Sequence, residues 1–313
     1  MNAVAAPRPD GDGRSSVSLA ELIVLRARVG RARMAPMSSH AARSGQQSSL
    51  LYGRGMDYAE SRVYQAGDDV RRLDWRLTAR SGKLHTKLFQ EDREGCLMIL
   101  LDTHASMRFG TRRRFKSVQA ARLAACAAWY AARAGERVGI MAFGQVDALL
   151  RPRSGARGAL AVCGALAEWD LQGEQQPERA EPLSDALLRT SRLLHGANRV
   201  LLISDGFSCD ADARQRWLAL RQHVGASVLV VADALEQSLP PSGRYPLEHA
   251  GERYDVVLHG ERQRRAFQQT LGAGSARLGQ LAQSTNTRWQ NVDTQTDPLT
   301  AVSAVLGSAK GAR

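Results

Sequence analysis

The sequence predicts an α/β fold, in which helices cover a doubly wound, mostly parallel sheet preceded by a helical and β-stranded N-terminal extension. Beyond residue 95, short apolar runs alternate with longer amphipathic segments, which is typical of βαβ units. These runs lack polar alternation, as expected for strands buried on both faces. The chain has 313 residues, 43% of them hydrophobic, which suffices for one large or two modest cores.

Three regions are expected along the chain, namely residues 1–17, 18–94 and 95–313. The first is polar, with proline, glycine and aspartate, and is predicted to be disordered. In the second, Ser18 and Glu21 have the spacing of a capping box, which begins a basic amphipathic helix reaching about residue 34. Such a helix could lie on a membrane surface, but we expect it to pack on its own domain.

The rest of the second region is polar. Residues 37–49 are rich in serine and glutamine and indicate a linker. Asp69 is placed to cap a short helix that Gly82 ends, and residues 84–89 alternate as a strand does.

The third region carries the predicted sheet. Strands are expected at residues 96–101, 138–143, 199–204, 227–231 and 288–292, with 148–150 turning back beside the second. Helices are expected at residues 115–134, 158–169, 183–194, 210–223 and 261–283. The carboxyl ends of parallel strands share one edge of the sheet, and ligand sites of such folds gather there.

Composition limits the classes of partner. The formal net charge of +12 favours an acidic protein surface, nucleic acid or an anionic membrane, although an arginine-rich proteome would also produce it. Aromatic residues make up only 5% of the chain and no helix-turn-helix or zinc motif occurs, which disfavours nucleic acid. No apolar run approaches the roughly 18 residues of a bilayer span, and no signal-peptide core is found. We therefore expect a cytoplasmic protein with at most peripheral membrane contact, and its four scattered cysteines to be reduced.

Two carboxylates follow strands at the edge where ligands are expected. Asp102 comes after the first strand of the sheet and Asp205 after the fourth. Together with the Ser106 hydroxyl they are oxygen donors of the kind that hold Mg²⁺. A basic patch follows at once, and its positive field opposes a dication. The patch consists of Arg108, Arg112, Arg113, Arg114 and Lys116.

These motifs carry a family resemblance. The Asp-x-x-x-Ser and Ser-Asp-Gly pieces resemble the metal-ion-dependent adhesion site of von Willebrand A domains. More specifically, an upstream segment resembles the DUF58 family through Gly53-Arg-Gly-Met-Asp-Tyr58, Arg62-Val-Tyr64, Gly67-Asp-Asp69, Arg71, Leu73-Asp-Trp75, Ala79-Arg80 and Lys87. The resemblance implies a von Willebrand A-like fold over most of the chain. It also implies a MoxR-type AAA+ ATPase as partner, with other von Willebrand A proteins as further candidates.

The chain departs from the adhesion-site pattern in two places. His104 stands where the first serine belongs, and Glu181-Pro-Leu-Ser184 offers no threonine in the third loop. Imidazole is a poor ligand for Mg²⁺, and few fixed oxygens remain. We therefore expect a degenerate site without a cofactor, in which Asp102 serves a hydrogen-bonded turn, with bound Mg²⁺ as the alternative.

The upstream segment has two interpretations. Its charged and aromatic residues could form a partner-docking surface, or an internal network of ion pairs and hydrogen bonds that pins the segment to the α/β domain with Trp75 as the apolar anchor. We favour the network. The residues concerned are Arg62, Tyr64, Asp68, Asp69, Arg71, Asp74, Trp75 and Arg80.

Catalytic motifs are not found. The sequence has no G-x-S-x-G elbow, no Walker lysine motif and no G-x-G-x-x-G after a strand. His104 replaces the second acid that a phosphoacceptor site at Asp102 would need. We expect a non-enzymatic, protein-binding adaptor or scaffold that works with a MoxR-type ATPase in the assembly or maturation of complexes. The alternatives are a basic protein that binds nucleic acid or anionic membranes, and a Mg²⁺-dependent adhesion module.

Overall fold

The computed structural model describes residues 10–32, 56–65, 67–91, 95–175, 180–193, 197–249 and 252–307. These residues fall into two compact units, 10–32 with 95–307 and 56–91. The first helix is therefore part of the α/β unit, whereas the sequence analysis grouped it with the segment that follows. The expected linker at residues 37–49 and the Gly53–Gly55 part of the family motif lie outside the described residues.

The central sheet of the larger unit has six strands in the order β10-β7-β6-β3-β4-β5. They are β3 (Cys96–Asp102), β4 (Arg137–Phe143), β5 (Ala148–Ser154), β6 (Arg199–Ser204), β7 (Gly225–Ala232) and β10 (Arg288–Asp293). All pair in parallel except β5, which runs antiparallel to β4. Every residue of β3 and β6 is buried, as their apolar runs predict. The doubly wound, mostly parallel fold is thus confirmed, and its strand order reverses between β3 and β6.

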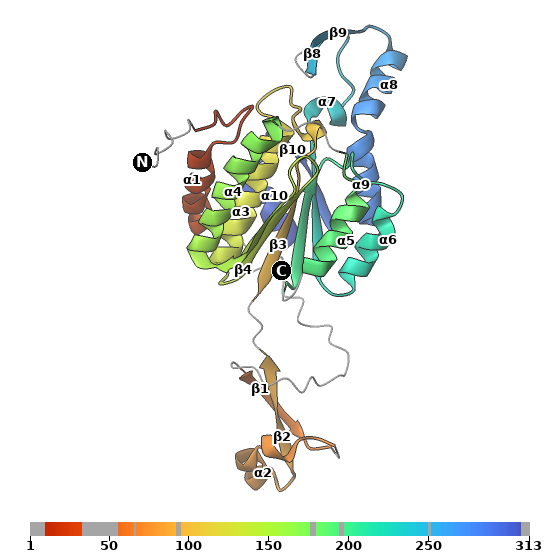
Figure 1. Cartoon of the computed structure of the whole chain (residues 1–313). Helices are drawn as coiled ribbons and strands as arrows, with labels where there is room; N and C mark the ends of the chain where they lie inside the picture. Colours follow the sequence, from red (N-terminus) through yellow and green to blue (C-terminus); the bar gives the residue numbers. More distant parts are fainter. Residues whose placement is uncertain are drawn as a thin grey trace, which may run out of the picture. The chain divides into compact units, whose positions relative to one another are not determined.

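Helices cover both faces of this sheet (Figure 1). One face carries α1 (Leu19–Arg31), α3 (Lys116–Arg133), α4 (Gly155–Gln175) and α10 (Pro298–Leu306), and the other carries α5 (Leu183–Leu193), α6 (Ala213–Arg221) and α9 (Ala273–Ser284). Successive residues of a strand face opposite cores because side chains alternate across a sheet. Ile99 accordingly packs in the first core and Leu100 in the second. Among the described helices, none has the length and apolar content needed to cross a membrane.

The α1 helix packs on its own unit. Its buried side chains are Leu22, Leu25 and Val29, which join the core beside α3. Trp129 of α3 donates its indole N–H to the Leu22 carbonyl at 3.0 Å, and Arg133 donates to the Val29 carbonyl at 2.6 Å. These contacts agree with the packing we expected and not with a helix lying on a membrane.

Residues 10–17 are ordered, so the prediction of disorder through residue 17 is wrong for them. The Asp12 carboxylate accepts the backbone N–H of Ser16 at 3.0 Å and closes a turn. Val17 is buried, and its N–H donates to Asp170 of α4 at 2.8 Å. Disorder was predicted from the polar composition of this segment. A turn closed by one aspartate and anchored by one apolar side chain changes that composition very little.

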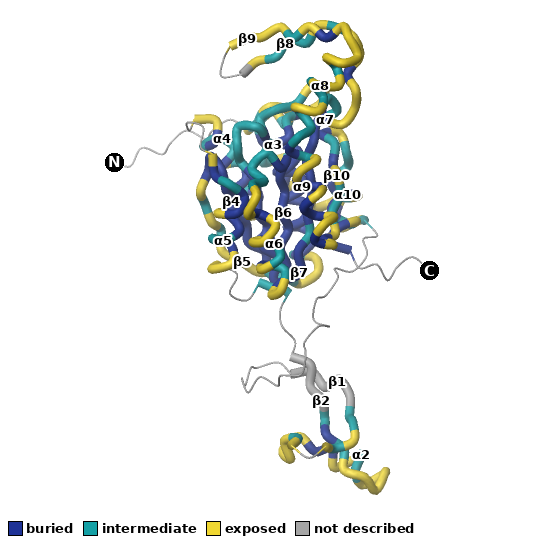
Figure 2. The backbone as a smooth tube through the Cα atoms, turned by 90° about the vertical axis from the view of Figure 1, so that its right-hand side faces the viewer, coloured by how far each residue is buried: buried dark blue, intermediate teal, exposed yellow. Residues whose placement is uncertain are grey.

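Two further features lie between β7 and β10 and were not predicted from the sequence, as was also the case for β1 (Met56–Val63) and α10. The two features are α7 (Ala234–Gln237) and a hairpin of β8 (Gly243–His249) and β9 (Glu252–Leu258), which is mostly exposed (Figure 2). The helix predicted at 261–283 is divided at Gly272 into α8 (Glu261–Leu271) and α9. A side chain at Gly272 would place its Cβ 2.7 Å from the Glu236 carbonyl oxygen, so glycine permits the close approach to α7.

The smaller unit is a hairpin that carries two short helical turns. β1 (Met56–Val63) pairs antiparallel with β2 (His85–Glu91), and between them lie a 3₁₀ turn (Val70–Arg72) and α2 (Trp75–Ser81). Asp69 caps the first turn, but Asp74 accepts the Leu77 N–H at 3.0 Å and starts a separate helix. The one helix that we predicted is therefore two elements, and Gly82, with φ of 69°, ends the second.

Candidate functional site

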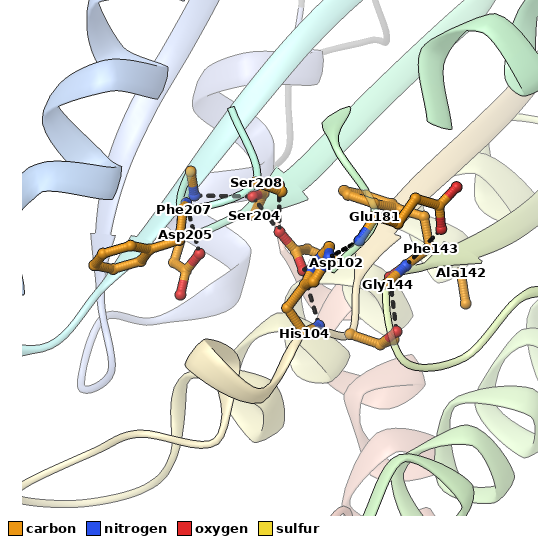
Figure 3. A network of polar contacts seen from close by, with 12 residues as sticks. Asp102, His104, Ala142, Phe143, Gly144, Glu181, Ser204, Asp205, Phe207 and Ser208 are labelled. Carbon is orange, nitrogen blue, oxygen red and sulfur yellow. Dashed lines mark hydrogen bonds and ion pairs between the residues drawn. The ribbon is translucent and has the colours of Figure 1, made fainter. Parts of the chain in front are cut away.

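Four neighbouring parallel strands of the α/β unit each end on an aspartate. Asp102 ends β3, Asp205 follows β6, Asp233 follows β7 and Asp293 ends β10. β3 and β6 adjoin at the reversal of strand order, so the first two lie where ligands of such folds bind (Figure 3). Asp102 and Asp205 were predicted from the sequence. Asp233 directly follows the apolar strand β7 and could have been found by the same pattern, whereas the mixed residues of β10 do not mark Asp293 in this way.

The Asp102 carboxylate is fully engaged inside the protein. Its side chain is 0% exposed, and Oδ1 accepts the His104 backbone N–H at 3.0 Å and the His104 ring Nδ1–H at 2.7 Å. Oδ2 accepts the hydroxyls of Ser204 at 2.6 Å and Ser208 at 3.1 Å. Burial would raise the pKa of Asp102, but the hydrogen bonds and charge of His104 and the bond from Ser204 outweigh it and lower the pKa below its usual value. The expected hydrogen-bonded turn is present, and the hydroxyls that could ligate a metal donate to the carboxylate.

His104 links this carboxylate to the third loop. In the neutral form of the ring, Nε2 accepts the backbone N–H of Glu181 at 3.1 Å and Nδ1 carries the hydrogen donated to Asp102. Its ring packs edge-on against Phe143, and a Cβ at Gly144 would lie 2.7 Å from Nδ1, so glycine is needed there. Burial opposes protonation, but the hydrogen bond and negative charge of Asp102 raise the pKa of His104.

A buried ammonium group neutralises the second carboxylate. Lys116 is 1% exposed, and its Nζ lies 2.9 Å from Asp205 Oδ2 and 2.6 Å from Glu236 Oε1 of α7. The rings of Phe109 and Phe207 flank it, with centroids 5.7 and 5.5 Å from Nζ. Burial lowers the pKa of Lys116, but the two carboxylates outweigh that and raise it. The expectation that Lys116 belongs to a basic surface patch is wrong, since the helix start points it inward.

The rest of the expected basic patch is also not one surface. Arg114 is buried and Arg108 half-buried, whereas Arg112 and Arg113 are exposed. Arg108 lies 3.5 Å from an Asp170 carboxylate oxygen.

Asp233 has a structural role. It is 0% exposed and accepts the Thr111 N–H at 3.1 Å, the Thr111 hydroxyl at 2.5 Å and the Leu235 N–H at 3.1 Å. Glu236 Oε2 in turn accepts the Asp233 N–H at 2.9 Å, which closes a capping box. This box fixes α7 and thereby holds the Glu236 carboxylate against Lys116.

The donor set does not fit a divalent cation. The Ser106 hydroxyl is buried without a partner among the described residues, which alone would suit a ligand. However, both oxygens of Asp102 are taken, and the Lys116 ammonium occupies Asp205 Oδ2 where a metal would require a free oxygen. No cluster of three or more metal-ligating His, Cys, Asp or Glu side chains occurs within the described ranges.

We expect millimolar Mg²⁺ to leave the thermal midpoint unchanged. A folded-state site at one hundred times its Kd would stabilise the protein by about 2.7 kcal/mol, which a melting curve resolves easily. The measurement is thermal unfolding with Mg²⁺ against EDTA. An increase of several degrees in the wild type that is absent from Asp102→Asn would contradict the expectation and restore the adhesion-site chemistry.

In the smaller unit, three acids of the family motif serve local structure. Asp68 lies 2.7 Å from Arg62 Nη2 in an ion pair and also accepts the Gln65 N–H at 2.9 Å. Asp69 and Asp74 cap the two helical turns, and the Ser61 hydroxyl donates to Asp74 at 2.8 Å. These bonds form a local network within the smaller unit, and the expected attachment of this segment to the α/β domain stays a prediction.

The aromatic residue of that motif is placed differently. Trp75 is 67% exposed at the first position of α2, so it is not the buried anchor that we expected. Tyr64 is half-buried, while Arg71 and Arg80 are exposed. Val63, Val70 and Leu84 of the same unit are exposed by 53%, 61% and 47%. The network and a solvent-facing apolar surface therefore occur together in this unit.

Comparison with known proteins places these features in a family. A family model described as "Protein of unknown function DUF58" matches residues 60–277. The uncharacterized proteins Mb1516 of Mycobacterium bovis and Rv1480 of Mycobacterium tuberculosis are each 38% identical over 97 residues, which are 31% of this chain and 31% of the relative. The matched part thus spans about a third of those relatives.

Two solved structures are similar to parts of this chain. The conserved hypothetical protein BatB from Bacteroides thetaiotaomicron is 16% identical with a TM-score of 0.43, over 67% of this chain and 95% of that chain. A von Willebrand factor type A protein from Catenulispora acidiphila is 13% identical with a TM-score of 0.33, over 62% of this chain and 45% of that chain.

Proposed function

Because the chain belongs to the DUF58 family, we propose that it is a non-catalytic adaptor that binds other proteins in the cytoplasm. Its partner in this proposal is a MoxR-type AAA+ ATPase, and its task is the assembly or maturation of protein complexes. The partner and the process follow from the family resemblance of the motif in the smaller unit. That unit also supplies the contact surface.

The exposure of Trp75 carries the proposal. Tryptophan and arginine are the residues that most often dominate the binding energy of protein interfaces. Here a tryptophan is 67% exposed, and Val70 of the same small unit is 61% exposed. The Arg62–Asp68 ion pair and the Asp74 cap hold the backbone that presents them, so little ordering entropy is lost on binding.

The strand-end carboxylates support binding without catalysis. A general acid, base or nucleophile must be able to reach its substrate. Asp102 and Asp205 are 2% and 1% exposed, and each already has internal partners of opposite charge or hydrogen-bond donors. In the proposal these groups hold loops together, and no metal or cofactor is required.

We expect Trp75→Ala to weaken binding to the MoxR-type ATPase of the same cell by roughly thirtyfold, the effect of a hot spot worth about 2 kcal/mol. The thermal midpoint should stay that of the wild type because the side chain is exposed. Binding is measured by surface plasmon resonance on the full chain.

Tyr254→Ala is the matched control, because this tyrosine is 49% exposed on β9 of the other unit. It should bind as the wild type does. Unchanged affinity for Trp75→Ala would show that this surface is not the interface. A lowered thermal midpoint would show that the rest of the chain covers Trp75, and failure of the wild type to bind any such ATPase would remove the proposed partner.

A further inference from the structure

A polar cavity of about 500 Å³ lies where the N-terminal turn meets the loop before α3. The backbone N–H of Phe115 donates to the Arg14 carbonyl at 2.8 Å and joins these two segments. The charged side chains that line the cavity are Asp12, Arg14, Glu21, Arg112, Arg113 and Arg114. Four arginines against two carboxylates give the lining a net charge of +2.

The two carboxylates are already engaged. Asp12 accepts three backbone N–H groups, at 2.7 Å from Arg14, 2.9 Å from Ser15 and 3.0 Å from Ser16. These hydrogen bonds, that of Ser16 first, hold the pKa of Asp12 far below its usual value. Glu21 Oε1 lies 3.3 Å from Arg114 Nη1 and 3.2 Å from Nε of Arg122 of α3. Neither carboxylate is therefore available to neutralise the other arginines.

Three guanidinium groups face the cavity without an ion-pair partner among the described residues. They are those of Arg14, Arg112 and Arg113, all exposed. Arg114 is only 7% exposed, and its Nε–H finds no acceptor in the described part of the chain. A buried donor left unpaired is unfavourable, so an anion that accepts a hydrogen bond from it would be favoured. Burial lowers the pKa of Arg122. The negative charge of Glu21 raises this pKa, and the positive charge of Arg113 lowers it further.

We propose that this cavity binds a small molecule carrying two or more phosphate groups. Guanidinium forks match phosphate oxygens and bind them with paired hydrogen bonds. The volume falls within the roughly 300–1,000 Å³ of small-ligand sites. The lining holds no aromatic ring on which a base could stack, so recognition is through the phosphates. All the lining residues belong to the α/β unit, and the proposed ligand is independent of the adaptor role.

The probe is inorganic tripolyphosphate, titrated into the full chain by isothermal calorimetry at low salt. We expect saturable binding with one site per chain, and a Kd at least tenfold weaker for Arg112→Ala/Arg113→Ala. Both side chains are exposed, so the fold should be unaffected, as the thermal midpoint checks. Arg262→Ala/Arg265→Ala on α8 removes the same charge from exposed positions outside the cavity and should bind as the wild type does.

Two further titrations test the ligand class. Citrate should bind at least tenfold more weakly than tripolyphosphate, and vesicles of phosphatidylglycerol should not bind more tightly than vesicles of phosphatidylcholine. The proposal is overturned if tripolyphosphate does not bind, or if the α8 control loses as much affinity as the cavity variant. Equal binding of citrate would overturn the phosphate assignment, and binding to anionic vesicles alone would assign the cavity to a membrane surface.

Discussion

Lys116→Met is expected to lower the free energy of unfolding by about 3–5 kcal/mol, the cost of leaving a buried ion pair without one partner. The ammonium group lies within 2.9 Å of Asp205 and 2.6 Å of Glu236, and all three groups are buried. Without the ammonium group, the carboxylates of Asp205 and Glu236 lie close together in the interior with no counter-charge. Methionine has a similar length, so the loss reports charge more than volume. Urea denaturation at pH 7 measures it.

The contribution of Lys116 to the free energy of unfolding depends on pH. The pKa of Lys116 is raised, so its contribution is present at neutral pH and is lost only as pH rises through that value, above about 10.4. Burial raises the pKa of Glu236 even beside Lys116, and removing the ammonium raises it further. The Lys116→Met variant should therefore regain stability as the pH is lowered and the Glu236 carboxylate binds a proton.

A triple variant is the control for this experiment. Lys116→Met/Asp205→Asn/Glu236→Gln removes all three charges and should recover most of the loss, because neutral amides need no counter-charge. If Lys116→Met alone unfolds at the wild-type urea concentration at pH 7, the ammonium does not hold this edge of the sheet together.

The sheet could be predicted from the sequence because each of its buried strands is identified by its own run of apolar residues. β3 and β6 are uninterrupted apolar runs followed by aspartates, so their burial and the position of Asp102 and Asp205 follow from pattern alone. The hairpin of β8 and β9 was missed because its mostly exposed strands carry charges and a proline at position 246, which obscure the strand pattern.

The partners of the strand-end acids could not be predicted in this way. Lys116 stands in a basic run, and nothing local distinguishes it from Arg112 or Arg113, which are exposed. What turns it inward is the backbone bond from its N–H to the Phe109 carbonyl at 2.8 Å and the start of α3. Trp75 was expected to be buried because large aromatic residues usually are. A unit of one hairpin and two helical turns has too little core to cover it.

Asp102→Ala is expected to cost about 3–5 kcal/mol in the free energy of unfolding, because several donors lose their acceptor at once. The ring and backbone N–H of His104 and the hydroxyls of Ser204 and Ser208 all donate to this carboxylate. Asp102→Asn is the matched control. It keeps one acceptor oxygen and the side-chain volume, so its loss should be about half as large.

The pH profile separates this network from simple packing. The pKa of Asp102 is lowered, so its contribution is present above the unfolded value of about 3.9 and is lost as pH falls through the folded value. The pKa of His104 is raised, so its contribution is present below about 6.5 and is lost as pH rises through the folded value. The stability gap between wild type and Asp102→Asn should hence be largest near pH 5 and smaller at both pH 8 and pH 3. Urea titrations at these three pH values measure the gap, and NMR of the His104 ring should place its pKa lower in Asp102→Asn than in the wild type. A gap that is constant across the three pH values would mean that the carboxylate and the imidazole stabilise the fold through packing alone.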